Sequence, residues 1–566
     1  MEYYSNPSHV IIPNKVNPLI GGVTLTEGRL AEVWDNNVRF LKRFDTDRML
    51  YWFRVYAGVD APGAPYGYDG GHFENNLYGQ TAGEFLMGAG TLLLWQEDAE
   101  LRQKMNDVVD GIAACADPDG YLVPIARDKF NTKEYPNYVR AWLTFGLLAA
   151  GAAGNETAYK LIRAMGDWFN ECDCLPYVKD LNLGFQGILA NTELYLSPVG
   201  VEKDLEVAQK FYREDWWLQQ LVNHEQRAIY QHPGNHPHST LLTTLEGILD
   251  MYRTTGEEFL LQAVQSALEM YEDKWQHVGG GIVMCEGDNH YPGCNFLSMN
   301  HSYNELCSTT FWILLHQRLH LLDPDNAHHT DQIEQSVYNM LAAAQVEDRG
   351  LHYLAFLEGC KDTRWVDMAT CCASTGTRLI SMLPQLLYTY SEKDIYVDLY
   401  ASSKANVAGT ELIMTTDMPY NGNVTLEVAS AQAPVCLHLR IPSWCSGPVT
   451  VCGVTAQPGT YLVLDNITAG TVLEFTLPFG WRTTRYTGEE AIYGKERYAV
   501  EYGPLLLAAI GRGGVTVQMD PDHPEEWLIP ISKNRFRLKG NNHQEYRVYM
   551  DITDEPLTVY PVVQEV

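Results

Sequence analysis

The spacing of apolar residues changes near residue 393, and this change most strongly limits the folds open to the chain. Between residues 80 and 392, apolar residues recur at i, i+3 and i+4, which is the period of an α-helix. From Asp394 onward they alternate with polar residues, which is the period of a β-strand. The sequence therefore predicts a helical part followed by a β part.

The helical part consists of consecutive helical patterns joined by short loops. "TAGEFLMGAGTLLLWQ" (81–96) is followed by "AELRQKMNDVVDGIAACA" (99–116), and "STGTRLISMLPQLLYTYS" (374–391) is expected to close the series as a helix. Helices joined by short loops pack as antiparallel hairpins. Roughly a dozen such helices in pairs indicate an (α/α)6-toroid, in which the inner helices surround a central cleft.

The β part has the pattern of a β-sandwich. Segments such as "VTLEVAS" (424–430) alternate in polarity and are separated by turn residues roughly every 8–12 positions. At 566 residues the chain is long enough for several cores. We expect an N-terminal β segment at 1–25 that joins the β layer, the toroid at 26–393, and a β-sandwich region of one or two domains at 394–566.

Charge and the N-terminal sequence narrow the classes of partner. With 40 Lys and Arg against 71 Asp and Glu, the net charge is −31, which disfavours nucleic acid and anionic membranes. The N-terminus lacks the basic and apolar regions of a secretory signal, and the run at 142–154 is too short to span a bilayer. We expect a cytoplasmic protein with reduced thiols, and a homodimer is compatible with the sequence.

Two adjacent cysteines, Cys371 and Cys372, stand in "MATCCAST" (368–375), just before a predicted helix. A disulfide between neighbours is strained, so another role is expected. Upstream, "SYNELCSTT" (302–310) contains a Glu and a third Cys at another predicted helix start. Three thiolates and one carboxylate could complete a tetrahedral zinc site.

The spacing alone leaves two alternatives open. The thiols could simply be buried without a metal. Cys172 and Cys174, in "ECDCLP" (171–176), form a rival metal-binding pair.

Several longer motifs together resemble the cysteine-nucleophile glycosidases of glycoside hydrolase families 127 and 146, which include β-L-arabinofuranosidases. The first is "NELCSTTFWILLHQRL" (304–319), followed some sixty residues later by the cysteine pair. The segment at 29–67 is similar to the N-terminal segment of that group. "LHLRIPSW" (437–444), "LPFGWR" (477–482) and "EYGPLLLA" (501–508) are similar to its β-domain motifs.

The resemblance implies a metal site and a catalytic pair. In the family, a Glu and three Cys hold a zinc ion, and the motif places them at Glu305, Cys307, Cys371 and Cys372. The first of the paired cysteines, Cys371, matches the family nucleophile. The family acid/base is a Glu shortly after a "GGIG"-like run, and here "VGGGIVMCEGD" offers Glu286.

The resemblance also implies substrate contacts. Glu334 in "IEQSVYN" and Tyr353 in "LHYLAFLEG" match family residues that contact the sugar or support the nucleophile. His238 in "NHPHSTLL" matches a histidine of the sugar pocket.

These residue types suit a retaining glycosidase, in which a nucleophile and an acid/base flank one anomeric carbon. Zinc would keep the Cys371 thiolate deprotonated near neutral pH. Glu286 would protonate the leaving oxygen and then activate water, with Glu358 or Asp288 as the fallback. We expect roughly 5–6 Å between the Glu286 carboxylate and the Cys371 sulfur.

The chain departs from the family at sugar-pocket positions. Gln80, Asn137 and Phe145 stand in segments where many relatives carry histidines. The resemblance therefore supports the reaction type better than the sugar. We predict a retaining exo-glycosidase acting on an oligosaccharide or glycoside with a terminal β-L-arabinofuranose or a related sugar. The alternative is a carbohydrate-binding, lyase-type or epimerase-type toroid protein with a purely structural zinc.

Overall fold

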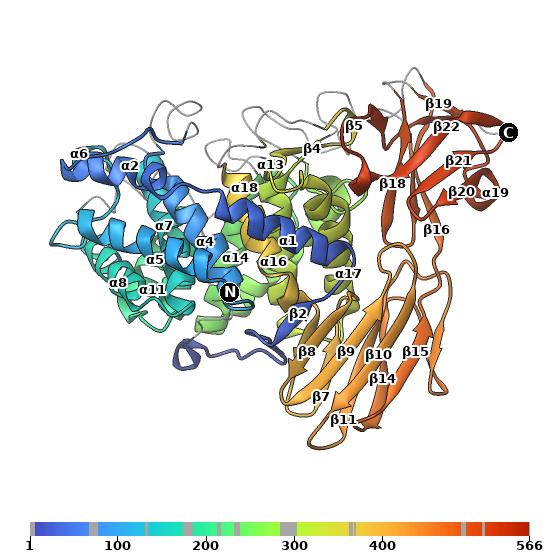
Figure 1. Cartoon of the computed structure of the whole chain (residues 1–566), viewed down its shortest axis with the longest axis horizontal. Coiled ribbons are helices and arrows are strands. Elements are labelled where there is room, and N and C mark those ends of the chain that lie inside the picture. The colour runs from blue at the N-terminus through green and yellow to red at the C-terminus, as the bar shows by residue number, and fades with distance from the viewer. Residues whose placement is uncertain are drawn as a thin grey trace.

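The computed structural model describes residues 6–66, 77–130, 134–173, 185–211, 217–230, 238–283, 303–361, 366, 370–487, 494–511 and 515–564. Helices fill the left and centre of the molecule in Figure 1, and the β-rich part lies on the right. The β-rich part has two regions, a sandwich below and a large twisted sheet above. The predicted helical domain of the toroid class, followed by a β-sandwich region, is confirmed.

The helical domain is built from paired helices in two layers. The inner helices are α4 (Gln80–Leu93), α7 (Glu134–Ala152), α14 (His238–Thr255), α16 (Leu306–Leu322) and α18 (Cys371–Ile380). Their partners include α5 (Ala99–Cys115), α8 (Glu156–Asn170), α15 (Glu258–Lys274) and α17 (Ala327–Ser336). Every residue of α4 is buried, whereas α8 buries one stripe. This difference follows from their sequences, because a helix that is apolar on all sides needs cover on all sides.

Glycines allow two inner helices to pack backbone to backbone. A Cβ atom at Gly83 of α4 would lie 2.6 Å from the Trp142 backbone of α7, and one at Gly90 would lie 2.5 Å from the Ala149 backbone. Such distances are shorter than van der Waals contact, so alanine at either position would push the two helices apart. The close approach fixes one side of the inner ring.

The sandwich consists of two five-stranded sheets, with strand orders β1–β6–β7–β11–β14 and β15–β10–β9–β8–β2. Their bounds are β1 (Asn17–Pro18), β2 (Val23–Leu25), β6 (Tyr388–Tyr390), β7 (Asp394–Val397), β8 (Ser403–Val407), β9 (Thr410–Thr416), β10 (Asn423–Ser430), β11 (Val435–Ile441), β14 (Thr460–Ile467) and β15 (Val472–Thr476). Along β9 and β10 buried and more exposed residues alternate, as the sequence pattern predicts. The N-terminal strands β1 and β2 pair with β6 and β8, so the chain start is part of the sandwich.

A ten-stranded sheet forms the C-terminal region. Its main path runs β19–β24–β17–β18–β22–β21–β20, and β16, β23 and β5 pair beside it. The bounds of these strands are β5 (Glu358–Gly359), β16 (Trp481–Tyr486), β17 (Arg497–Tyr502), β18 (Leu505–Ile510), β19 (Thr516–Gln518), β20 (Leu528–Ser532), β21 (Arg535–Leu538), β22 (Asn541–Val548), β23 (Leu557–Thr558) and β24 (Val562–Gln564). Strand β5 lies before α18 in the sequence, so a loop of the helical domain adds a strand to this sheet.

The helix expected at 374–391 ends early. Helix α18 stops at Ile380, a short 3₁₀ turn follows at Leu383–Leu386, and β6 begins at Tyr388. Pro384 explains the break, because proline lacks an N–H and clashes with the preceding helical turn. The prediction of one helix is therefore wrong beyond Ile380.

A buried ionic contact joins the helical domain to the sandwich. Arg440 of β11 is completely buried. Its Nη1 lies 2.6 Å from Asp331 and its Nη2 lies 2.7 Å from Glu334, both on α17. The Trp444 indole N–H donates to the other Glu334 oxygen at 2.6 Å. A charge buried at a junction needs such partners, so these contacts favour one relative placement of the two domains.

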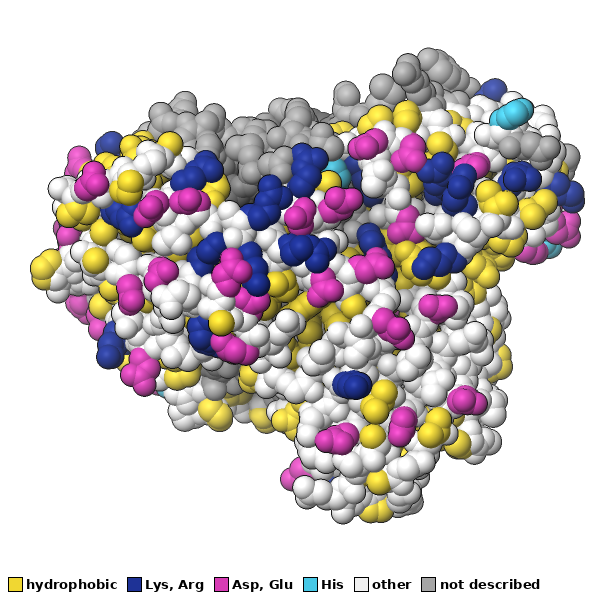
Figure 2. All heavy atoms as spheres, viewed as in Figure 1, with side chains coloured by type: hydrophobic (Ala, Val, Ile, Leu, Met, Phe, Trp, Pro, Cys, Tyr) yellow, Lys and Arg dark blue, Asp and Glu magenta, His cyan; other side chains and the backbone are white. Residues whose placement is uncertain are grey.

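Positive and negative side chains are interspersed on the face shown in Figure 2. Within the described residues, no helix is both long enough and apolar enough to cross a membrane.

Candidate active site and metal centre

Two helix starts supply the thiols of the predicted metal site. Glu305 ends the short strand β3 (Tyr303–Glu305), which pairs with β4 (Leu354–Phe356), and Cys307 follows in the first turn of α16. Cys371 and Cys372 are the first two residues of α18. Extended backbone thus delivers both segments to the same end of the inner helices.

Thr370 sets where α18 begins. Its backbone is extended, and its hydroxyl accepts a hydrogen bond from the Ala373 backbone N–H at 3.1 Å. This is the N-cap arrangement, which satisfies one of the free N–H groups at a helix start. The cap places both cysteines in the first turn, where the helix dipole favours negative charge.

The predicted ligands converge. One donor atom from each of Glu305, Cys307, Cys371 and Cys372 lies within 4.8 Å of every other. The pair Glu305 and Cys307 lies more than sixty residues before the pair Cys371 and Cys372, so only the fold brings the two pairs together. Tetrahedral zinc–sulfur bonds of about 2.3 Å would separate two sulfurs by about 3.8 Å, so small side-chain shifts would close the set around an ion. The donor types and their spacing fit Zn²⁺.

Hydrogen bonds orient these donors. The Cys307 backbone N–H donates to the Cys372 sulfur at 3.4 Å, and the Thr375 hydroxyl donates to the Cys307 sulfur at 3.6 Å. Ser308 donates to Glu305 Oε2 at 2.8 Å. Contacts of this kind fix the orientation of metal ligands and tune their basicity.

Burial makes a cation necessary if the thiols are to ionise. It raises the pKa of Cys307 and of Cys372 well above the ordinary thiol value, and neighbouring thiols raise the pKa of Cys372 further. Both thiols therefore stay protonated without a metal. A bound divalent ion reverses this, because a coordinating thiol is deprotonated.

Cys371 differs from the other two cysteines in exposure. It is 7% exposed, against 3% for Cys307 and 0% for Cys372. Its sulfur lies 3.6 Å from the Tyr353 hydroxyl oxygen, to which the thiol donates. Cys371 is therefore the least buried cysteine of the cluster, and Tyr353 lies beside it.

A buried ionic fork supports the two helices that carry the thiols. Glu193, on α10 (Ala190–Leu196), lies 3.3 Å from Arg318 of α16 and 3.3 Å from Arg378 of α18. Arg318 also contacts Glu246 at 2.6 Å and Asp250 at 3.3 Å, both on α14. All five side chains are buried. The fork links the C-terminal parts of α16 and α18, the two helices whose N-terminal turns carry the thiols.

The sequence did not predict this fork, although charged residues inside strongly apolar helical segments pointed to buried ion pairs. Arg318 lies inside "FWILLHQRLHLL" and Glu193 inside "LANTELYL", both otherwise rich in apolar residues. A charge inside a fully buried helix needs an opposite charge nearby. The sequence did not show which helices would supply it.

The other predicted site residues fall into three groups. Glu286, and the fallback Asp288, lie outside the described residues, and so does the side chain of His238 at the start of α14. Glu334 contacts the sandwich domain through Arg440 and Trp444. The second fallback acid, Glu358, pairs with Arg497 of β17 at 2.7 Å, so its carboxylate faces the C-terminal sheet.

The rewritten sugar-pocket positions lie on the inner helices. Gln80 hydrogen-bonds Glu84 within α4. Asn137 accepts a hydrogen bond from the buried Arg140 at 2.8 Å within α7. The Arg378 guanidinium lies 5.5 Å from the Phe145 ring centre. These three positions therefore contact other residues of the inner ring.

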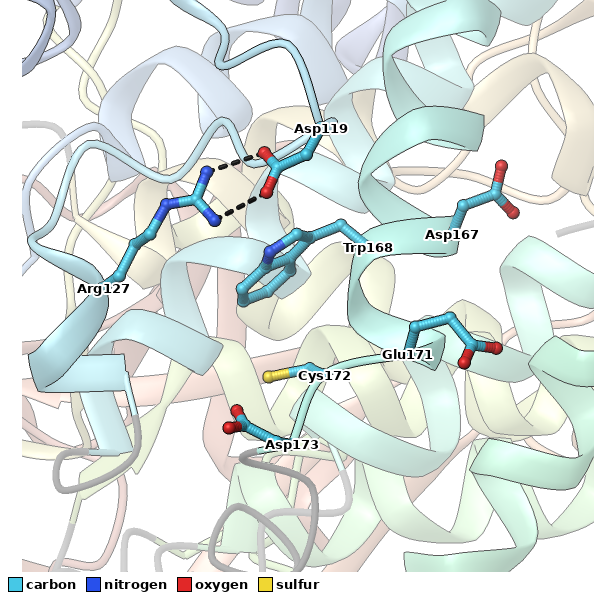
Figure 3. Close-up of a pocket in the computed structure, with 7 residues that line it drawn as sticks. All are labelled: Asp119, Arg127, Asp167, Trp168, Glu171, Cys172 and Asp173. Carbon is cyan, nitrogen blue, oxygen red and sulfur yellow. Dashed lines mark hydrogen bonds and ion pairs between the residues drawn. The ribbon is translucent and has the colours of Figure 1, made fainter.

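A separate hollow of about 520 Å³ lies at the C-terminal end of α8 (Figure 3). In it Arg127 binds Asp119 through two nitrogens, at 2.7 and 2.6 Å, beside the Trp168 indole. The lining residues are Asp119, Arg127, Asp167, Trp168, Glu171, Cys172 and Asp173, and none of them belongs to the cysteine cluster.

The rival metal pair is not supported. Cys172 is disulfide-bonded, and no other described cysteine is its partner. A disulfide sulfur has no thiolate to offer a metal, so this half of the pair is unavailable. The expectation that all thiols are reduced is also wrong for Cys172. Cys174 lies outside the described residues.

Solved structures of glycoside hydrolases share the fold. A GH127 β-arabinofuranosidase matches with a TM-score of 0.73 and 18% identity, covering 98% of this chain and 99% of that chain. A GH127 β-L-arabinofuranosidase from Geobacillus stearothermophilus T6 gives 0.71 and 17%, covering 96% and 100%. A third chain, described as a glycoside hydrolase, gives 0.70 and 16%, covering 99% of both. A comparison with curated protein sequences gives no match.

Family models identify the domains. The β-L-arabinofuranosidase GH127 catalytic domain matches residues 22–385, and the GH127 middle domain matches residues 394–479. The first match covers most of the chain and includes all four residues of the cysteine cluster. The resemblance inferred from the motifs is thereby confirmed, and the chain belongs to the GH127 β-L-arabinofuranosidase family of glycoside hydrolases.

Proposed function

We propose that this glycoside hydrolase is a retaining exo-glycosidase in which Cys371 is the nucleophile and a zinc ion is held by Glu305, Cys307, Cys371 and Cys372. The convergence of these four donors, with Cys371 the most exposed thiol, carries the proposal. The proposed substrate is an oligosaccharide or glycoside ending in β-L-arabinofuranose or a related sugar. The solved relatives named for β-arabinofuranosidase activity support this substrate class.

The ion, when bound, would keep the Cys371 sulfur as a thiolate near neutral pH. The sulfur attacks the anomeric carbon, so a carbon–sulfur bond forms as the bond to the leaving oxygen breaks. An acid gives that oxygen a proton, and we assign this role to Glu286. The same group then takes a proton from water, which attacks the anomeric carbon and releases the sulfur, so two inversions give net retention.

Tyr353 is proposed to position the nucleophile. Its hydroxyl lies 3.6 Å from the Cys371 sulfur, and its ring packs in the core. A hydroxyl in this place can donate to a thiolate and limit the directions in which the sulfur moves.

Glu334 and His238 stay predictions as sugar-binding residues. A cytoplasmic location, a homodimer, and the lack of nucleic-acid and membrane partners also stay predictions.

The alternative is a toroid protein with a purely structural zinc. The observation in its favour is the closed donor set, because structural zinc sites commonly fill all four positions with protein ligands. A catalytic thiolate in such a set must leave the ion or react while bound to it. The two roles therefore differ in whether a sugar ever becomes attached to Cys371.

The first-formed product decides between them. NMR should show that the released sugar keeps the anomeric configuration of an aryl β-L-arabinofuranoside. An inverted product would exclude Cys371 as nucleophile.

E286Q should retain zinc and lose more activity on leaving groups of high pKa than on activated aryl glycosides. Equal losses on both substrate types would remove Glu286 from the acid role.

A further inference from the structure

A second group of metal-binding side chains lies in the sandwich domain, on three neighbouring strands. β7 and β11 run parallel, with Asp394 opposite Cys436 and Tyr396 opposite His438. Cys436 and His438 are two residues apart, so their side chains leave the same face of the sheet. One thiol, one imidazole and one carboxylate are thus gathered by strand register alone.

Their donor atoms are close together. The Cys436 sulfur lies 3.5 Å from His438 Nε2, which lies 3.5 Å from Asp394 Oδ1. All three donor atoms lie within 4.8 Å of one another, and all three residues are partly exposed. An ion from solvent could therefore reach them without local unfolding.

A β-bulge adds a second carboxylate. β14 pairs with β11 on the side away from β7, and the register shifts between Val435 and Leu437. Asn466 has a φ of +58°, the left-handed conformation that such a bulge uses. The shift sets Asp465 and Asn466 of β14 together opposite Cys436, and the Asp465 carboxylate lies near enough to interact with the thiol. Cys436 thus lies between carboxylates from both neighbouring strands.

Surrounding contacts hold two of these donors in place. The His438 ring stacks on Tyr396, with ring centres 4.1 Å apart and planes 23° apart. Ser391 donates to Asp394 Oδ2 at 2.8 Å, so Oδ1 is the oxygen that faces the cluster. Ligands held in this way lose little freedom when an ion binds.

We propose that Asp394, Cys436, His438 and Asp465 bind a second zinc-like divalent ion. Sulfur and imidazole ligands select zinc and similar transition metals over Ca²⁺ and Mg²⁺, which prefer oxygen. One thiol, one imidazole and two carboxylates also match the four positions of a tetrahedral site. Cys436 would bind the ion as a thiolate, so its proton would leave as the ion binds.

The ion would act on the structure, since no residue of this group belongs to the cysteine cluster of the helical domain. It would tie together three strands of the sheet that contacts the toroid. On the same face of β11, Arg440 binds α17. Tyr396 also donates to Asp325, which lies between α16 and α17, at 3.1 Å. Metal binding would therefore stabilise the sandwich side of the domain junction.

Zinc stoichiometry tests the proposal on the full chain. The protein is purified under reducing conditions, incubated with micromolar zinc and dialysed, and its metal content is measured by mass spectrometry. We expect two zinc ions per chain in the wild type and one in C436S and in H438A. C452S, which removes an exposed cysteine of the same domain, should keep two. One ion in the wild type, unchanged in C436S, would overturn the proposal, and so would a second ion that binds only at millimolar zinc.

Two further measurements keep the test independent of folding and of the proposed catalysis. C436S and H438A should hydrolyse substrate within about twofold of the wild type, because the first zinc remains. Added Co²⁺ should give the apo wild type thiolate charge-transfer bands from two sites, and C436S should lack one set.

If circular dichroism shows that C436S does not fold, D394N replaces it and should bind one zinc. D394N with two tightly bound ions would overturn the assignment of Asp394 as a ligand.

Discussion

The two clusters of metal-binding side chains in this protein, the helical cluster and the sandwich cluster, are built in opposite ways. In the helical domain, Cys307, Cys371 and Cys372 are buried at two helix starts. Hydrogen-bond donors contact the sulfurs, and the ionic fork joins the two helices further along. In the sandwich, Cys436 lies on the partly exposed face of a sheet between two aspartates. The comparison teaches that two helix starts can enclose several thiols in the core, where they need a cation to ionise, whereas strand register gathers mixed ligands on a partly exposed face of a sheet.

The largest expected effect comes from removing a fully buried thiol of the helical cluster. C372S should lose the zinc of the helical cluster, so that one ion per chain is left of the two, and should lower kcat/KM by about 1,000-fold or more, because the parts of a catalytic unit fail together. C115S, which changes a buried cysteine outside the cluster, is the control. Metal analysis and initial rates measure the outcome. A C372S variant that keeps its activity after losing the helical zinc would show that the helical cluster is not the catalytic one.

The ionic fork is the next test. E193Q should lower the free energy of unfolding by about 3–5 kcal/mol, because Arg378 and Arg318 would lose a buried countercharge. Urea unfolding measures it, with E206Q, at an exposed pair with Lys203, as the control that should leave the midpoint unchanged. If the fork positions α16 and α18, E193Q should also weaken zinc binding at the helical cluster but not at the sandwich cluster. Equal weakening at both would show a general loss of stability instead.

The same fork predicts a pH dependence. Burial raises the pKa of Glu246 to about 7 from its ordinary 4.5. Between these values the unfolded chain has released the proton while the folded chain keeps it, so stability falls as pH rises from about 4.5 to 7 and changes little beyond. The wild type should lose on the order of 2–3 kcal/mol relative to E246Q over this range, as urea unfolding at several pH values would show. If the free energy of unfolding changed with pH in the same way in the wild type and in E246Q, Glu246 would not be the group responsible.

Tyr353 gives the smallest expected effect. Y353F should lower kcat by about tenfold with little change in zinc content, because one hydrogen bond to the sulfur is lost, about 1.4 kcal/mol. A structural role alone would lower the thermal midpoint and leave kcat unchanged. Comparing the pH profile of kcat in the two proteins adds a second readout, since loss of a donor to the thiolate should move its acidic limb upward.

The sequence by itself determined the two fold classes and the donor set of the helical cluster. A change of period from helix to strand is local information, and each helix or strand carries it in its own residues. Glu305 with Cys307, and Cys371 with Cys372, are also local pairs, and the family resemblance joined them into one site. The extent of the last helix was mispredicted, because Pro384 outweighs the apolar pattern around it.

Tertiary structure alone decided which distant groups meet. Nothing near Glu193 in the sequence indicates that Arg318 and Arg378 lie against it, because their contact depends on how three helices pack. Likewise, Asp394 and Cys436 become neighbours only through the parallel register of β7 and β11, and Asp465 reaches them only through a bulge. Periodicity specifies which face of an element is buried, but the partner of a buried charge or ligand depends on the three-dimensional arrangement of the elements.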